Sequence, residues 1–140
     1  MTTEIRKHVS DMTVAEKSFL MKRFYSLKFD FRKHARDRLN QRGIDFKDFL
    51  KTWKGMCQLV EYTRKGCSNR IMLRSLRAHK GKNILVVINL NTGEVVSLYW
   101  IYKKRPFYRS KAHSDGAGLD IIKIFGEVPD EKIIKKVHNF

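Results

Sequence analysis

The chain has 140 residues, and its hydrophobic share of 42% is enough to build the core of one globular domain. Thirty Lys and Arg residues against fourteen Asp and Glu residues give a formal net charge of +16, which favours a polyanionic partner. No apolar run approaches the roughly 20 residues that cross a bilayer, and the polar N-terminal segment is unlike a signal peptide, so we expect a cytoplasmic protein without membrane contact.

Three helices are expected in the first part of the chain. Thr13 opens a capping box, and the apolar residues that follow it recur at helical intervals over about 14–27. A second helix should begin near Phe31 and end at Gly43. Asp45 is a suitable N-cap for a third, short helix with an apolar face.

Short β-branched and aromatic runs separated by turn residues follow the helices, and they indicate an antiparallel meander. The four expected strands are Gln58–Thr63, Arg70–Arg77, Asn83–Leu90 and Val95–Tyr102. Helices followed by consecutive strands predict an α+β domain in which the N-terminal helices pack on a four-stranded antiparallel sheet.

We expect a single domain over residues 1–140, with its core at about 31–102 and an N-terminal helix within residues 1–30. Residues 103–140 form a basic loop and a C-terminal extension. This extension contains a short apolar run and a further helical pattern after Pro129, and we expect it to cover an edge of the sheet.

Positive charge is concentrated in two segments that contain no acid, one between Glu61 and Glu94 and one between Glu94 and Asp115. The cations that we expect to bind nucleic acid in these segments are Arg64, Lys65, Arg70, Arg77, Lys80, Lys82, Lys103, Lys104, Arg105, Arg109 and Lys111. The alternative is that they are solvated side chains that keep the protein soluble.

A histidine and two arginines form a row on the second expected helix. His34, Arg38 and Arg42 are four residues apart and therefore share one line along its surface. Such a row can serve a phosphodiester, because the histidine moves protons while the arginines bind the phosphate oxygens. The alternative is a solvated helix face, on which a histidine between arginines has no chemical role.

RNA can be cut without a metal ion because its own 2′-OH is the nucleophile, so the protein supplies a base, an acid and positive charge. An arginine of the second strand, Arg70 or Arg74, is a candidate for stabilising the phosphate. Simple alternation places Val95, Ser97, Tyr99 and Ile101 on one face of the last strand, where Ser97 and Tyr99 can hydrogen-bond to phosphate or sugar. The acids form no cluster of the kind that holds Mg²⁺.

The segment Lys33–Ile44, read together with Val95–Tyr99, resembles a small bacterial and phage family whose signature is HAxxRxxxRGI followed by a meander ending in a VVTVY-like strand. That family is similar to the metal-independent BECR ribonucleases, the superfamily that contains barnase, RelE and the colicin D nuclease. The shared core of the superfamily is an N-terminal helical part on a four-stranded antiparallel sheet. The resemblance implies an RNA-cleaving or RNA-binding activity, with His34 as the catalytic histidine and Ser97 where the family usually has threonine.

We therefore expect a metal-independent endoribonuclease that needs no cofactor, cuts tRNA or mRNA, free or on the ribosome, and leaves a 2′,3′-cyclic phosphate. Such a protein would be a toxin or a phage or mobile-element factor, with an acidic antitoxin or immunity protein as a partner. One alternative is a non-catalytic protein, such as a phage-encoded inhibitor, that binds RNA or a ribonucleoprotein through the same basic face. The other alternative is a DNA-binding regulator.

Overall fold

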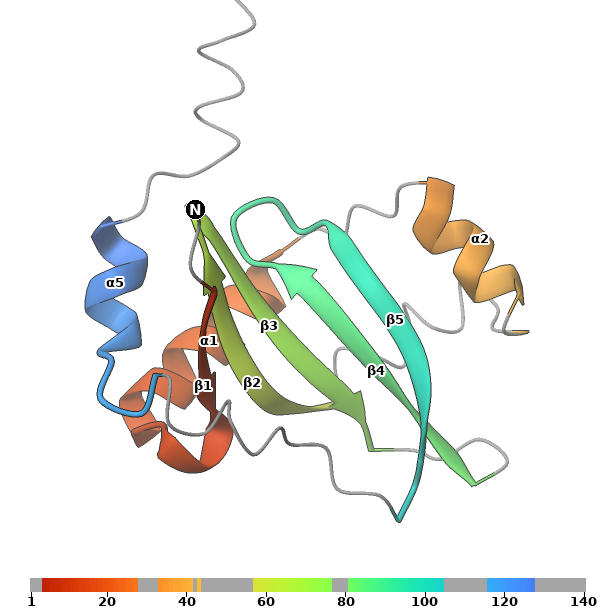
Figure 1. Ribbon diagram of the computed structural model, residues 1–140, viewed down its shortest axis with the longest axis horizontal. Coiled ribbons are helices and arrows are strands. Elements are labelled where there is room, and N and C mark those ends of the chain that lie inside the picture. Colours follow the sequence, from red (N-terminus) through yellow and green to blue (C-terminus); the bar gives the residue numbers. More distant parts are fainter. Residues whose placement is uncertain are drawn as a thin grey trace, which may run out of the picture.

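The computed structural model describes residues 4–27, 33–41, 43, 57–76, 81–104 and 116–127 (Figure 1). In chain order its elements are β1 (Glu4–His8), the 3-10 helix η1 (Val9–Asp11), α1 (Val14–Ser26), α2 (Lys33–Gln41), β2 (Cys57–Lys65), β3 (Ser68–Ser75), β4 (Lys82–Asn89), β5 (Val95–Tyr102) and α5 (Ile121–Glu127). The third helix expected after Asp45 and the helical pattern expected after Pro129 lie outside these residues.

The strands form one antiparallel sheet in which β1, β2, β3, β4 and β5 lie side by side in chain order. The fold class is therefore α+β, as the sequence predicts, and the four expected strands are present. The expected number of four strands was wrong, because β1 adds a fifth strand that pairs with β2. The sequence of β1 is polar and its buried residue is Lys7, so no apolar alternation marks this strand.

The helix α1 begins where its capping box predicts. The Thr13 side chain accepts a hydrogen bond from the Glu16 N–H at 3.1 Å, and the Thr13 N–H donates to the Glu16 carboxylate at 2.9 Å. Leu20 and Phe24 then place their side chains in the core with no exposed surface. Full burial of each such side chain contributes about 1.5–3 kcal/mol to folding.

The helix α2 lies against β5, although more than fifty residues of sequence separate the two elements. Its residue Leu39 is fully buried and belongs to the main hydrophobic cluster. This contact brings the segment that carries the histidine row next to the last strand of the meander.

The two faces of the sheet bury different clusters. One face, which we call the helix face, packs against helix residues, and its cluster includes Tyr62, Ile71, Leu73, Val86 and Leu98 of the sheet with Leu20, Phe24, Leu39, Ile121 and Phe125 of the helices. The opposite face, which we call the second face, carries a smaller cluster of Val60, Met72, Leu85 and Ile101. In Figure 1 α1 crosses behind the sheet, so the second face is turned toward the viewer.

A β-bulge changes the alternation of β5. Val87 pairs with Ser97 but the next residue, Ile88, pairs with Val95, so Val96 is an extra residue in β5. Val95 consequently joins the cluster on the helix face. The expectation that Val95 shares a face with Ser97 was therefore wrong, because simple alternation cannot show an inserted residue.

Residues 116–127 return to the first strand. A Cβ atom on Gly116 would lie 2.4 Å from the carbonyl oxygen of Arg6, so this close approach of two backbones requires glycine. Farther along, the ring of Phe125 meets the ring of Phe19 in α1 edge-on, with 5.3 Å between the centroids. This segment therefore lies against β1, which is an edge strand of the sheet.

Candidate nucleic-acid interface

Strand alternation distributes the expected cations over both faces of the sheet. Arg70 and Arg74 flank Met72 and therefore lie on the second face. Arg64 is two residues from Tyr62 and shares the helix face. The acid-free segment between Glu61 and Glu94 therefore does not form one continuous basic surface.

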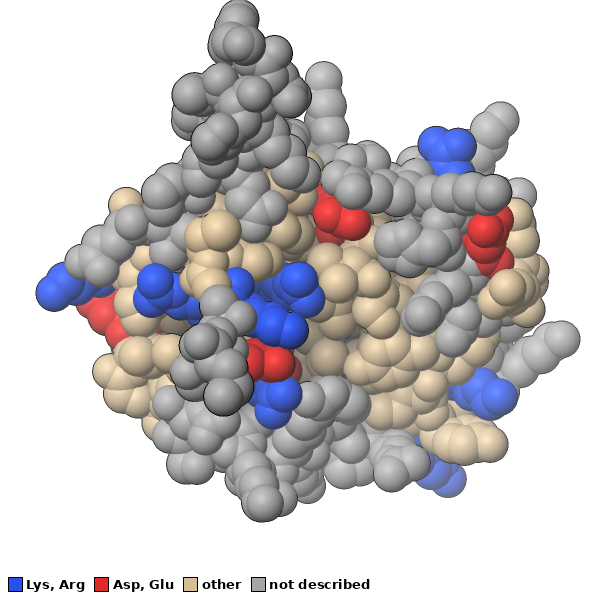
Figure 2. Space-filling model, turned by 45° about the horizontal axis from the view of Figure 1, so that its top comes forward, with Lys and Arg blue, Asp and Glu red and all other residues tan. Residues whose placement is uncertain are grey.

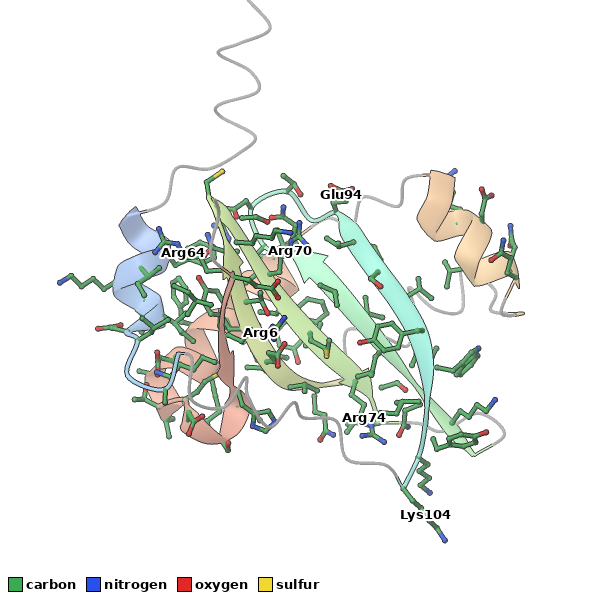
Figure 3. The ribbon with its side chains drawn as sticks, in the orientation of Figure 1. Arg6, Arg64, Arg70, Arg74, Glu94 and Lys104 are labelled. Atoms are coloured by element: carbon green, nitrogen blue, oxygen red, sulfur yellow. The ribbon has the colours of Figure 1, made fainter. Side chains whose placement is uncertain are left out.

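The two ends of the sheet differ in how acids and bases are mixed. Figure 3 shows Arg64 and Arg70 at one end, on the side of Glu94, and Arg74 and Lys104 at the other end. In Figure 2, which turns the first of these ends toward the viewer, lysine and arginine side chains gather beside acidic ones. Arg70 and Arg74 are about 13 Å apart along the strand.

A cavity of about 560 Å³ opens at the Arg74 end, and we call it the basic cavity. Its described lining residues are Gln58, Arg74, Ser75, Leu76, Asn83, Lys103 and Lys104. Among these residues three are cations, two are amides that can donate hydrogen bonds, and none is a carboxylate. An anion in the basic cavity therefore meets cations and neutral donors, with no acid among the described lining residues.

The Arg74 guanidinium has a structural role in the basic cavity, because it hydrogen-bonds to two neighbouring strands. Its Nε donates to the side-chain oxygen of Asn83 at 3.0 Å, and its Nη2 donates to the carbonyl oxygens of Tyr102 at 3.1 Å and Lys103 at 2.8 Å. The residue is only 8% exposed. These acceptors are neutral oxygens, so they satisfy N–H groups of the guanidinium while Arg74 joins β3 to β4 and to the end of β5.

Lys103 and Lys104 carry the accessible charge of the cavity. Both residues are exposed and follow directly after β5. The Lys103 N–H donates to the carbonyl oxygen of Gly81 at 2.8 Å, so the backbone that carries these lysines is fixed to the start of β4. Lys82, which follows Gly81, has its ammonium 5.3 Å from the centre of the Tyr102 ring.

Ser97 and Tyr99 lie on the same face as Arg74. The register pairs Arg74 with Leu85 and Leu85 with Tyr99, so Arg74 and Tyr99 are two strands apart, roughly 10 Å. Both Ser97 and Tyr99 are partly buried, and Tyr99 packs against the cluster of the second face.

The structure describes only part of the histidine row. His34 and Arg38 lie within α2, but their side chains, and all of Arg42, are outside the described part of the structure. The inward-facing Leu39 belongs to the cluster of the helix face, whereas Ser97 is on the second face. Five other expected cations also lie outside the described residues: Arg77, Lys80, Arg105, Arg109 and Lys111.

Several residues of this region were not expected from the sequence. Gln58 and Asn83 line the basic cavity, and β1 brings Arg6 onto the second face opposite Thr63, where it forms an ion pair with Glu4 at 2.8 Å. Tyr102 is 65% exposed at the end of β5. Gln58 and Asn83 begin expected strands, but only the strand register brings them together.

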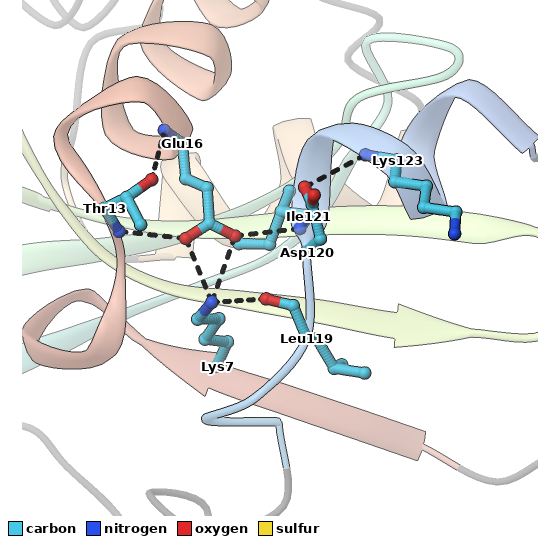
Figure 4. A network of polar contacts seen from close by, with 7 residues as sticks. All are labelled: Lys7, Thr13, Glu16, Leu119, Asp120, Ile121 and Lys123. Atoms are coloured by element: carbon cyan, nitrogen blue, oxygen red, sulfur yellow. Dashed lines mark hydrogen bonds and ion pairs between the residues drawn. The ribbon is translucent and has the colours of Figure 1, made fainter.

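A second cavity, of about 420 Å³, lies where η1 and α1 meet the residues before α5. Its lining includes Lys7 together with Asp11, Glu16 and Asp120, so acids outnumber bases there. Figure 4 shows that Lys7 and Glu16 are held in a hydrogen-bonded network with Leu119 and Ile121. An acidic lining repels phosphate, so this cavity is not part of the candidate interface.

Hydrogen bonding changes the pKa of Glu16 in that network. Burial raises the pKa of this carboxyl, but the N–H groups of Thr13 and Ile121 and the ammonium of Lys7 all bind its charged form. Together they outweigh burial and hold the pKa below the ordinary value of 4.5.

No protein-family model, curated protein or solved structure matches this chain. Within the described ranges, no three His, Cys, Asp or Glu side chains gather closely enough to hold a metal ion. Of the helices in the described part of the chain, none is long and apolar enough to cross a membrane.

Proposed function

We propose that this protein binds the phosphate backbone of RNA at the basic cavity. The observation that carries the proposal is the composition of the described lining, in which Arg74, Lys103 and Lys104 stand beside two amide side chains and no described residue is a carboxylate. Lysines bind phosphate oxygens as mobile point charges, and amides donate hydrogen bonds to phosphate or ribose. Arg74 supports the site by holding the end of β5 in place.

The binding test removes charge from the cavity without removing its structural arginine. Lys103→Gln with Lys104→Gln is compared with Lys17→Gln with Lys22→Gln, whose lysines are exposed on α1 and change the net charge equally. The cavity variant should bind RNA about 10-fold more weakly, and the slope of log affinity against log salt should fall by about 1.4. Equal losses in the two variants would show that binding depends on net charge and not on the cavity.

RNA is proposed over DNA because the basic cavity shares the second face with Ser97 and Tyr99, which offer hydroxyl groups to a ribose. The matching test is competition between an RNA strand and a DNA strand of the same sequence at one salt concentration. Tighter binding of duplex DNA than of RNA would favour a DNA-binding regulator instead.

A second proposal is that the protein also cleaves the bound RNA, as a member of the RelE- and barnase-like ribonucleases would. The observation that favours it is the contact between α2 and β5, because these elements carry the two distant segments of the resemblance. In the proposed step a base removes the proton of the 2′-OH, the 2′-oxygen forms a bond to phosphorus, and the bond from phosphorus to the 5′-oxygen breaks. An acid protonates the leaving 5′-oxygen, and the product end is a 2′,3′-cyclic phosphate.

His34 is the proposed base or acid, so the cleavage test is made on that residue. Wild-type protein, His34→Ala and Gln41→Ala, an exposed residue of the same helix, are each incubated with total RNA in EDTA. Wild type and Gln41→Ala should produce fragments with cyclic phosphate ends, and His34→Ala should not. RNA that is bound but left intact by all three proteins would favour the non-catalytic alternative, in which the same face occupies an RNA or a ribonucleoprotein.

A further inference from the structure

We infer that the basic cavity takes single-stranded RNA and that Tyr102, at the end of β5 just before the cavity lysines, stacks on an unpaired base. The inference rests on the proposed RNA binding and adds the form of the RNA and a residue that contacts it. Tyr102 is the last residue of β5 and is followed at once by Lys103 and Lys104 of the cavity. Strand alternation places its side chain, with that of its partner Lys82, on the helix-face side of β5, whereas Arg74 and Asn83 of the cavity are on the second face. Because β5 is an edge strand, an RNA strand whose phosphates bind these lysines can pass around this edge and bring a base to the Tyr102 ring.

The exposure of Tyr102 is the first observation behind the inference. The ring is 65% exposed, while neighbouring residues of β5 such as Leu98 and Ile101 are buried. An aromatic ring that contributes little to the core is available to stack on a base, and every base offers a π-face for this contact.

The charges around the ring are the second observation. The Lys82 ammonium lies 5.3 Å from the ring centre, and the next two residues of the chain are lysines. An exposed aromatic ring among cations is the usual arrangement of single-strand binding surfaces, in which bases stack while phosphates follow the positive charge.

The backbone beneath the ring is held in place before any ligand binds. The Tyr102 carbonyl oxygen accepts a hydrogen bond from Arg74 at 3.1 Å. In the strand register Tyr102 pairs with Lys82 of β4. The Lys103 N–H donates to Gly81 O at 2.8 Å. A fixed backbone reduces the entropy that stacking costs, so the ring is prepared for a ligand.

The geometry favours a single strand over a duplex. Inside a double helix both faces of each base are covered by neighbouring bases, so a side chain on the protein surface cannot stack on them. The Tyr102 ring therefore adds affinity only when the bound nucleotide is unpaired.

The experiment compares Tyr102→Leu, Tyr102→Phe and Tyr25→Leu, the last being a control on α1 whose tyrosine is 51% exposed. Each protein is titrated with an unstructured RNA strand, with the same strand annealed to its complement, and with a strand of equal length that has abasic positions. Base–aromatic stacking predicts that Tyr102→Leu loses about 5- to 150-fold in affinity for the normal single strand. Tyr102→Phe and Tyr25→Leu should bind like wild type.

The duplex and the abasic strand make the result specific. Tyr102→Leu should bind both of them as wild type does, and its salt dependence should be unchanged because no charge has been removed. Equal binding of the normal single strand by wild type and a correctly folded Tyr102→Leu overturns the inference while RNA binding stands. The inference is also overturned if Tyr102→Leu loses as much affinity for the abasic strand as for the normal strand. If wild type binds no RNA, both the inference and the proposed function are overturned.

Discussion

The ammonium of Lys7 lies 2.9 and 3.0 Å from the two carboxylate oxygens of Glu16, and both side chains are only 4% exposed. The same ammonium donates to the carbonyl oxygen of Leu119, and the Glu16 carboxylate accepts the N–H of Ile121 at 2.8 Å. One buried ion pair thus joins β1, the start of α1 and the segment that leads into α5.

Removing the cation from this pair should destabilise the fold strongly. Lys7→Met leaves the Glu16 carboxylate buried beside Leu119 without its ammonium, and the loss of one partner of a buried pair costs about 3–5 kcal/mol. Lys17→Met is the control, because Lys17 is exposed on the same helix as Glu16. Urea unfolding should show a large loss of unfolding free energy for Lys7→Met and little change for Lys17→Met. Equal urea midpoints for the two variants would contradict this role of the pair.

Acid should remove the contribution of Glu16 to stability. Because the folded-state pKa of Glu16 is below its ordinary value of 4.5, its contribution is fully present above pH 4.5 and is lost as the pH falls through the lower, folded-state pKa. Glu16→Gln should therefore be less stable than wild type at pH 7 and should approach it as the pH falls below 4.5. The measurement is the urea midpoint of both proteins as a function of pH. A difference between the two midpoints that grows as the pH falls would contradict the prediction.

The close approach at Gly116 should tolerate no side chain. Gly116→Ala places a Cβ atom 2.4 Å from the Arg6 backbone oxygen, and the required shift of backbone should cost about 1–3 kcal/mol. Gly118→Ala is the matched control, because a Cβ atom there meets nothing within 4 Å. Thermal unfolding of the two variants measures the difference, and equal melting temperatures would mean that the chain does not pass so close to β1.

The two cysteines should react at different rates with an alkylating reagent. Burial raises the pKa of Cys57 to about 11, so this thiol carries little thiolate at pH 8. Cys67 is exposed in the turn between β2 and β3. Mass spectrometry after iodoacetamide treatment at pH 8 should find Cys67 labelled first, and preferential labelling of Cys57 would place that residue at the surface.

Local sequence signals predicted the elements whose structure depends on nearby residues. The Thr13 capping box marks the start of α1 because both of its hydrogen bonds are made within one turn. The β-branched runs mark β2 to β5, because half-buried strands select such residues along their length. β1 was missed because the burial of Lys7 depends on Glu16 in the following helix and on Leu119, more than a hundred residues away.

The candidate site could be predicted only in part for the same reason. The charges of Arg74, Lys103 and Lys104 are visible in the sequence, but only the strand register brings Gln58 and Asn83 beside them. The sequence also could not reveal that Arg74 is occupied in holding the end of β5. The exposure of an aromatic strand residue is likewise set by its neighbours in space.

Lysine footprinting tests the central claim, RNA binding at the basic cavity, most directly. The protein is acetylated briefly with and without bound RNA, and the modification of each lysine is measured by mass spectrometry. Lys103 and Lys104 should be protected by RNA, while Lys17 and Lys22, exposed on α1, should react equally in both samples. Unchanged reactivity of Lys103 and Lys104 in protein that is saturated with RNA would contradict the account.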